Sequence, residues 1–206
     1  MATPEEDAQL ALTTGQNQAQ TPITHYPTSK AHRTLGVYVS PDFQTTHALR
    51  ILRQKVLQYT LRMTRGNLSR YNAWTCYFHC LIPKLAYGLD VMTHTSQDLY
   101  DLQRPAISAT LSKLGFRRTV NRSIVFGSPF YGGLGLRDLY VEQGIAQLQL
   151  FIRHLRAESS QGQLLRIALS WYQLHAGVSW PLLQYPQTQL QFLPSTWLTS
   201  TRDFLA

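Results

Sequence analysis

The chain of 206 residues is long enough for one domain of ordinary size with a tail, and 44% of its residues are apolar. Its formal charge of +8 and isoelectric point of about 9.7 indicate nucleic acid or another anionic surface as a partner. Only 15% of the residues are charged, so the basic excess comes from a shortage of acids. The simpler alternative is a basic soluble domain without such a partner.

The first part of the chain, residues 1–30, is rich in Gln, Thr, Ala and Pro and predicts a disordered leader. It begins MATPEED and lacks the apolar core of a signal peptide. No apolar run reaches the ~18 residues that a membrane helix needs. We therefore expect an intracellular protein, nuclear or cytoplasmic, that is not secreted and has no membrane partner.

A short apolar strand, TLGVYV at 34–39, is the first element expected after the leader. Gly36 inside this strand suggests a bulge or a close backbone approach. A Pro-Asp turn follows at 40–42, and a helix then runs over about 45–65 and stops at Gly66. The apolar seam of this helix has spacings of three and four: Leu49, Leu52, Val56, Tyr59 and Met63.

Two further helices are predicted over about 71–87 and 96–114. The first is apolar around most of its circumference, as in the central helix of a bundle, and Pro83 should kink it. The second is expected to be interrupted at Pro105 and closes at Gly115.

Later helices are predicted over about 139–157, capped by Asp138, and over 161–175. The residues of the first that should face inward are Leu139, Ile145, Leu148, Ile152 and Leu155. The tail from Gly177 is irregular and rich in Trp and Pro, with a last turn of helix near 196–205.

The fold class predicted from these elements is mainly α, a bundle of about five helices with a short β element at its N-terminal entrance. The chain divides into the leader at 1–30, a helical domain at 31–176 and the tail at 177–206.

Residues that usually carry catalysis are dispersed. The eleven acids lie mostly in the leader and at helix starts, and no HExxH or GxSxG motif occurs. Cys76, His79 and Cys80 superficially resemble metal ligands, but a second ligand pair is missing, so buried reduced thiols are favoured. No acid is near His79 in the sequence to orient it for nucleophilic catalysis. We expect no catalytic residue, metal site or cofactor.

The Gly-rich run at 132–135 precedes a helix, as phosphate-binding loops do. No Lys-Ser or Lys-Thr follows it, and its spacing is not that of a dinucleotide fingerprint. A tight turn that packs Leu134 and Leu136 beneath the next helix is the favoured interpretation.

Basic residues without acids are the strongest signal, because no Asp or Glu occurs at 43–89 or at 104–137. Lys55, Arg62 and Arg65 recur at spacings of seven and three, which places them on one helical stripe. Such a stripe can follow the phosphates of a nucleic acid; the alternative is a solvated helix face, which normally mixes Glu with Lys. The candidate nucleic-acid-binding residues are Arg50, Arg53, Lys55, Arg62, Arg65, Arg70, Arg117, Arg118 and Arg122.

Several segments occur in an order that has a parallel in a known family. They are TLGVYVS at 34–40, a basic helix, LIPKLAYGL at 81–89, a further helix with a basic loop, and YGGLGLRDL at 131–139. This order resembles the part of non-long-terminal-repeat retrotransposon reverse transcriptases that follows their catalytic motifs. The resemblance covers about residues 30–175.

By this resemblance, a primer-grip strand would lead into a helical thumb over 31–176. Leu35, Gly36 and Val37 would lie near the primer terminus, and the basic helix would face the minor groove of the template–primer duplex. The YxDD motif is absent from this chain, as are the fingers and most of the palm. We therefore expect a C-terminal part of a retroelement polymerase that binds DNA, RNA or a hybrid, without activity of its own. A palm or fingers segment supplied by another chain is a second expected partner.

Two other functions are alternatives to nucleic-acid binding. A structural or protein-interaction domain with no nucleic-acid role would account for the apolar second helix and the Trp- and Pro-rich tail. A self-contained hydrolase or nuclease is disfavoured, because the acids are not clustered.

Overall fold

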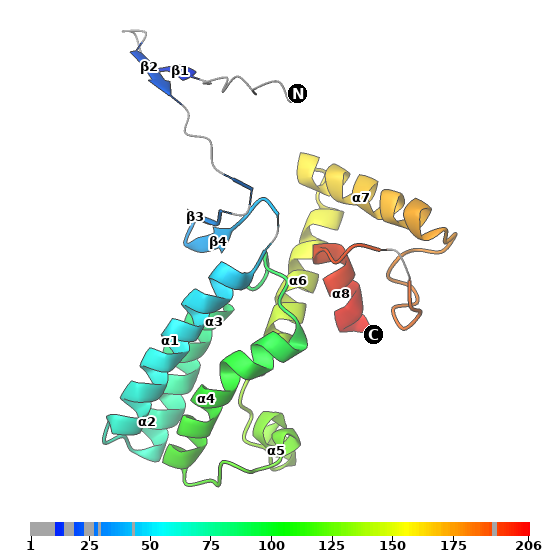
Figure 1. Ribbon diagram of the computed structural model, residues 1–206. Coiled ribbons are helices and arrows are strands. Elements are labelled where there is room, and N and C mark those ends of the chain that lie inside the picture. Colours follow the sequence, from blue (N-terminus) through cyan, green and yellow to red (C-terminus); the bar gives the residue numbers. More distant parts are fainter. Residues whose placement is uncertain (1–10, 15–18, 23–26, 29, 43, 191–192) are drawn as a thin grey trace, which may run out of the picture.

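The structure, a computed structural model, describes residues 11–14, 19–22, 27, 28, 30–42, 44–190 and 193–206. It is mainly helical, with short antiparallel strands before the first helix, which confirms the predicted fold class (Figure 1). The elements are, in chain order, β1 Ala11–Thr14, β2 Ala19–Pro22, β3 His32–Thr34, β4 Val37–Val39, α1 Thr46–Arg65, α2 Arg70–Thr75, the π-helical η1 Cys76–Leu81, α3 Ile82–Ala86, α4 Ser96–Leu114, α5 Arg122–Phe126, the 3₁₀ turn η2 Pro129–Tyr131, α6 Leu139–Arg156, α7 Ser160–Ala176 and α8 Trp197–Leu205.

The segment predicted to be a disordered leader contains a described pair of strands. β1 and β2 pair antiparallel, with Ala11 opposite Pro22 and Thr14 opposite Ala19. The sequence analysis assigned no strand here; a two-stranded pair needs only main-chain hydrogen bonds, and the Thr residues of this segment favour extended backbone. Most of the remainder of 1–30 lies outside the described residues, so its disorder stays a prediction.

The strand predicted at 34–39 is instead a hairpin. β3 and β4 pair antiparallel, and Leu35 and Gly36 form the two-residue turn between them. Both turn residues have positive φ, 50° and 90°, as a type I′ turn requires. The close approach predicted at Gly36 is present, because a Cβ there would lie 3.2 Å from the ring of Tyr87. The tyrosine hydroxyl also donates a hydrogen bond to the carbonyl of Leu35 at 2.5 Å.

The core forms where α1, the α2–η1–α3 segment and α4 pack side by side (Figure 1). The predicted bounds of α1 and α4 are close to the observed ones, with Gly66 and Gly115 at their C-terminal ends, but the interruption predicted at Pro105 is absent, since α4 runs through it. The predicted seam of α1 faces the core, with Tyr59 half-buried and the other four residues buried. Burial raises the pKa of Tyr59 to about 12, and its hydroxyl lies 3.1 Å from that of Thr110.

The predicted helix at 71–87 is continuous in the chain but changes its winding at η1. The π-helical turn ends just before Pro83, which has no N–H and whose ring would clash with the carbonyl of His79 in a regular α-helix. Widening the helix by one residue removes this clash, so the proline is accommodated by a π-helical turn. The side chains of Tyr77, Leu81 and Leu85 are buried against α1 and α4.

The helix α6 packs on α3 and α4, and α7 and α8 pack on α6 (Figure 1). Asp138 caps it as predicted, but Ile145 and Ile152 are exposed, and Gln143 and Gln147 are buried in their place. The reason is a polar partner: Gln143 bonds both the N–H and the C=O of His94, and Gln147 donates to the C=O of Met92 at 2.7 Å. These bonds fix the connector before α4 to α6.

The predicted fifth helix is α7, and the predicted last turn is α8. The irregular tail at 177–190 is fixed to α8 by Arg202, whose guanidinium donates to the carbonyls of Leu182, Tyr185 and Thr188. Trp197 at the start of α8 donates to the carbonyl of Asp90 at 2.7 Å. The tail is therefore packed back onto the bundle.

Candidate nucleic-acid interface

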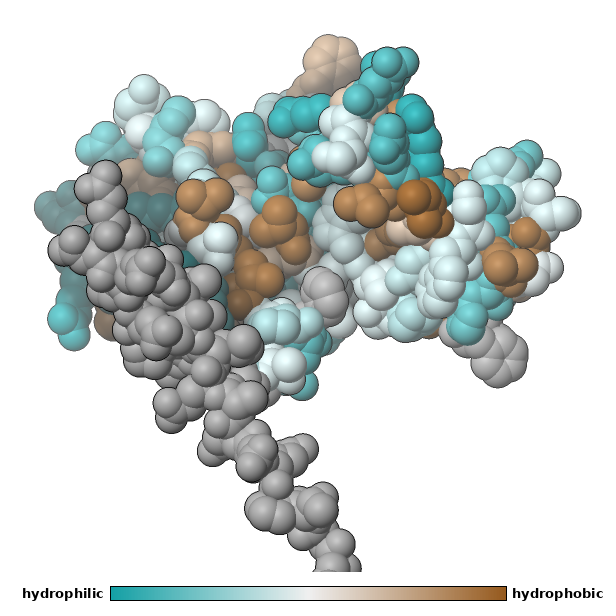
Figure 2. Space-filling view, turned by 90° about the horizontal axis from the view of Figure 1, so that it is seen from above, coloured by the Kyte–Doolittle hydropathy of each residue, from teal (hydrophilic) through white to brown (hydrophobic). Residues whose placement is uncertain are grey.

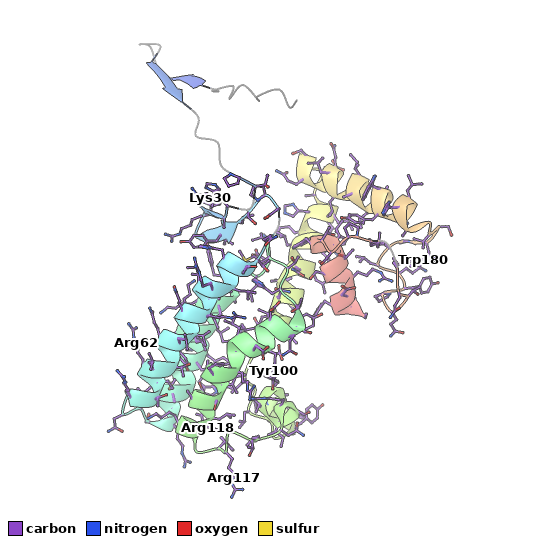
Figure 3. All side chains as sticks on the ribbon, in the orientation of Figure 1. Lys30, Arg62, Tyr100, Arg117, Arg118 and Trp180 are labelled. Atoms are coloured by element: carbon purple, nitrogen blue, oxygen red, sulfur yellow. The ribbon has the colours of Figure 1, made fainter. Side chains whose placement is uncertain are left out.

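One end of the bundle carries cations from three separate segments. Arg62 and Arg65 lie in the last turn of α1, Arg70 is the first residue of α2, and Arg117 and Arg118 follow α4. Figure 3 shows Arg62 near this end, and Arg117 and Arg118 beside one another below α4. Together with Lys113 of α4, these residues are called the basic end.

The three segments of the basic end are joined by direct contacts. Lys113 donates from Nζ to the carbonyl of Gly66 at 2.8 Å, which links the end of α4 to the end of α1. The guanidinium of Arg70 packs on Gly115, where a Cβ would lie 3.0 Å from its Nη2 atom. Arg118 donates from Nε to Ser112 at 3.0 Å. Residues far apart in sequence are thus brought into one site.

The remaining candidate cations of α1 lie elsewhere on that helix. At about 100° per residue, Arg50 and Arg53 project from the opposite flank of α1 to Lys55 and Arg62. Arg50 is held by His47, with 3.1 Å between Nη2 and Nδ1, and Lys55 reaches the carbonyl of Lys84 at 3.5 Å. Lys55 therefore lies on the same side of α1 as Arg62, as the predicted stripe requires.

Arg122 is the candidate that the structure turns away from the basic end. It is the first residue of α5, which begins at the cap Asn121, and its guanidinium lies 5.8 Å from the ring centre of Tyr100. One of its nitrogens is buried and has no partner within the described part of the chain. The sequence analysis grouped it with Arg117 and Arg118 because it could not show that a helix begins between them.

The basic end has no acidic counterpart. Arg137 and Glu142 form an ion pair at 3.4 Å, and neither residue belongs to the basic end. Cations in the last turn of a helix also stabilise the helix dipole, and Arg62, Arg65 and Lys113 all occupy such positions. The dipole does not account for Arg70, Arg117 and Arg118, which lie at a helix start and in a loop.

Three exposed aromatic residues adjoin the basic end, and the sequence analysis did not identify them as site residues. Tyr71 and Trp74 lie on α2, and Phe116 follows Gly115. Trp74 belongs to the helix predicted to be apolar around most of its circumference, where an aromatic residue is normally buried. For the other two, the available signal was that Tyr71 follows Arg70 and Phe116 precedes Arg117 in the sequence.

The primer-grip-like residues lie at the other end of α1. The hairpin contacts the start of α1, and the basic end lies about 30 Å away along the 20 residues of that helix. Leu35, at the tip of the hairpin, is 88% exposed, and Val37 is half-buried. Beside it lies a mainly apolar groove of about 560 Å³ between the hairpin, α3 and α6. Figure 2 looks onto this end of the molecule and shows apolar surface beside the hairpin.

The Gly-rich run is a tight turn, as the sequence favoured. The amide groups of residues 132–136 all donate to main-chain carbonyls, including Leu134 to Ile124 and Leu136 to Val125. No amide of this run remains to bind a phosphate. Leu136 is buried and Leu134 half-buried, which completes the predicted packing.

The cysteines differ from the prediction of buried thiols. Both are free; Cys76 is half-buried, and Cys80 is exposed on the π-helical turn. Burial raises the pKa of the Cys76 thiol, and the neighbouring Cys80 adds to this shift. Within the described ranges, no three His, Cys, Asp or Glu side chains are close enough to hold a metal ion.

His94 is the one strongly perturbed histidine in the described part of the chain. It is buried in the connector before α4, and neither ring nitrogen has a hydrogen-bond partner among the described residues. Burial lowers the pKa of His94 to about 4, against a smaller opposing effect of the Asp98 carboxylate. With no polar partner for its ring, His94 is a neutral core residue and is not placed for catalysis.

The site as a whole presents cations and exposed aromatic rings. Of the helices that the structure describes, none has the length and apolar character needed to cross a bilayer. The chain matches no protein-family model, no curated protein and no solved structure.

Proposed function

We propose that this protein is a thumb-like nucleic-acid-binding module, related to those of retroelement reverse transcriptases, that holds a template–primer duplex through its phosphates. The observation that carries the proposal is the basic end: six cations from three separate segments meet with no carboxylate among them. Surface faces that have no such partner normally mix acids with bases. Contacts to phosphates carry no sequence information, so binding is largely independent of sequence.

The distance between the hairpin and the basic end fits a duplex. About 30 Å along α1 corresponds to about nine base pairs at 3.4 Å each. In this arrangement, Leu35, Gly36 and Val37 lie near the primer terminus, and the basic end holds the duplex about one turn away. Lys55, between the two ends, contacts the backbone on the same side as Arg62.

No polymerisation by this chain alone is part of the proposal. Nucleotide transfer needs clustered carboxylates to hold two metal ions, and the YxDD motif of the family does not occur in this sequence. The palm that carries this motif would be a separate partner. Synthesis on a primed template by the purified chain would therefore overturn this part of the proposal.

The test is the triple substitution Lys55→Gln, Arg62→Gln and Arg65→Gln, which removes the predicted stripe without adding bulk. Affinity for a primer–template duplex should fall steeply, while the unfolding midpoint in urea changes little. Arg62 and Arg65 are exposed, and the half-buried Lys55 makes a single long hydrogen bond, at 3.5 Å to the carbonyl of Lys84. If the variant binds the duplex as tightly as the original chain at low and moderate salt, α1 is not the binding helix.

A second candidate, a protein-interaction domain, is favoured by one observation. α7 carries an exposed apolar stripe of Leu164, Ile167, Trp171 and Leu174, at helical spacing and on the face away from α6. Replacing Ile167 and Leu174 with Gln should then abolish association with the partner and leave duplex binding unchanged. A chain with no affinity for nucleic acid at low salt would favour this candidate over the first.

A further inference from the structure

The aromatic–arginine patch, formed by Arg70, Tyr71, Trp74, Phe116 and Arg117, is a surface that phosphate binding does not explain. Tyr71 is 75% exposed, Phe116 43% and Trp74 41%. Large aromatic side chains are more often packed in the core, and here three of them lie at one end of the bundle. A duplex held only by its phosphates would make no use of them.

Tyr71 and Trp74 form a pair of neighbouring rings on one face of α2. They are three residues apart, so their side chains are adjacent and offset by about 4.5 Å along the helix axis. Trp74 is supported from below by Phe78, with ring centres 4.3 Å apart. One ring is thus fixed by packing and the other projects into solvent.

Arg70 and Phe116 extend the pair toward the loop after α4. On the helical wheel of α2, Arg70 lies about 40° from Trp74, on the same exposed side. Its guanidinium packs on Gly115, and Phe116 is the next residue in the chain. Arg117 follows directly and is exposed. The patch therefore combines three aromatic rings with two guanidinium groups.

This combination of aromatic rings and cations favours one kind of ligand. In a duplex the faces of the bases are covered by their neighbours, so aromatic side chains cannot stack on them from outside. Unpaired bases offer both faces, and a groove that combines cations with stacking rings binds single strands with little sequence preference. A protein partner would complement the rings, but it would leave the two arginines unpaired unless it carried acids.

We propose that the aromatic–arginine patch binds unpaired nucleotides of a single strand next to the duplex, with bases stacked on Tyr71 and Trp74. This inference rests on the proposed function, because the same basic end supplies the phosphate contacts. The ligand is a single-stranded segment of DNA or RNA, and the 2′-hydroxyl of RNA is not needed for stacking.

The test measures affinity for short oligo(dT), for oligo(U) and for a blunt duplex, with the full chain. Tyr71→Ala should weaken single-strand binding by about fivefold to 150-fold, the range expected for one lost base–aromatic stack. It should change blunt-duplex binding by less than twofold. The matched control is Trp171→Ala, which removes a 52% exposed aromatic side chain stacked on His175 in α7 and should change neither affinity.

Tryptophan fluorescence gives a second readout that does not depend on stability. A base stacked on Trp74 should quench its emission, so oligo(dT) should quench the original chain, and Trp74→Phe should lose this quenching. Affinity in Trp74→Phe should be largely kept, because Phe still offers a ring. This result separates stacking from a loss of packing on Phe78.

The outcomes distinguish the two proposals. One result would overturn the stacking inference and leave phosphate binding standing. In it, Arg62→Gln with Arg65→Gln weakens the binding of all three ligands, and Tyr71→Ala weakens the binding of none. Quenching by oligo(dT) that persists in Trp74→Phe also overturns it. If none of the three ligands binds at low salt, the proposed function fails as well.

Discussion

The two halves of the described fold differ most in charge. Residues 30–138 carry fifteen Lys or Arg against five Asp or Glu, whereas residues 139–206 carry four against three. The first half exposes cations at the basic end, and the second half exposes an apolar stripe on α7. A polyanion and an apolar partner are therefore expected to bind different halves of the molecule.

Buried polar side chains hold parts of the second half in place. Gln143 and Gln147 hold the connector before α4, and the buried Arg202 holds the tail. Each of these side chains satisfies main-chain carbonyls that would otherwise be buried without a partner. Stability in this half should therefore respond to single polar substitutions that leave the half with the basic end intact.

The largest expected effect of this kind is Arg202→Met. It removes hydrogen bonds to three carbonyls of the tail while keeping a side chain of similar length, and should lower the free energy of unfolding by about 3 kcal/mol. Duplex affinity should change by less than twofold. Urea unfolding and a binding titration measure the two effects.

The matched control for Arg202 is Arg166→Met, an exposed arginine of α7 that bonds one carbonyl, that of Leu155 at 2.9 Å. Its effect on unfolding should stay below about 1 kcal/mol. Equal losses in the two variants would contradict the role given to Arg202, and a large loss of duplex affinity in Arg202→Met would contradict the independence of the two halves.

A smaller effect is expected from pH, at the junction of the halves. Burial lowers the pKa of His94 from 6.5 in the unfolded chain to about 4 in the folded chain, so the unfolded state binds more protons between these two pH values. The contribution of His94 to stability is complete above pH 6.5 and falls as pH falls toward 4, by about 2 kcal/mol at pH 5. The measurement is the free energy of unfolding against pH, in the original chain and in His94→Leu.

The variant His94→Leu keeps an apolar side chain in the pocket and cannot take up a proton. It should lose less stability than the original chain between pH 6.5 and 4, and the Asp98 carboxylate is present in both. Parallel stability curves for the two proteins would show that His94 is not buried as a neutral ring.

The smallest effect is expected at the tip of the hairpin. Leu35 adopts φ of 50°, a left-handed conformation that Asn tolerates better, so Leu35→Asn should stabilise the chain by about 1 kcal/mol. If Leu35 contacts the primer terminus, the same variant should bind a primer–template less tightly. A thermal melt and a binding titration test the two effects. Gly36→Ala is the control in the opposite direction: it places a Cβ 3.2 Å from the ring of Tyr87 and should lower the melting temperature of the chain.

Local signals in the sequence were enough to predict the long helices. Gly66 and Gly115 mark the ends of α1 and α4, and Asp138 marks the start of α6. The hairpin at 32–39 was missed because its turn is Leu-Gly, without the Asn or Asp that normally indicates a type I′ turn. The signals at helix ends involve residues a few positions apart, and so the sequence alone is enough to predict them.

Faces that depend on a distant partner were harder to predict. The spacing of Ile145 and Ile152 is as helical as that of Gln143 and Gln147, and only the carbonyls of Met92 and His94 decide which pair is buried. The cations of the candidate site could be found from the missing acids. Their convergence depends on the ends of α1 and α4 meeting, which no local pattern shows.

The most direct test of the central claim compares two matched arginines. Arg65 is the last residue of α1, and Arg156 is the last residue of α6; both are exposed. The measurement is the slope of log K for duplex binding against log salt concentration. Arg65→Gln should make the slope shallower by about 0.9, the contribution of one phosphate contact, and Arg156→Gln should leave it unaltered. Equal slopes in the two variants would contradict the assignment of nucleic-acid binding to the basic end.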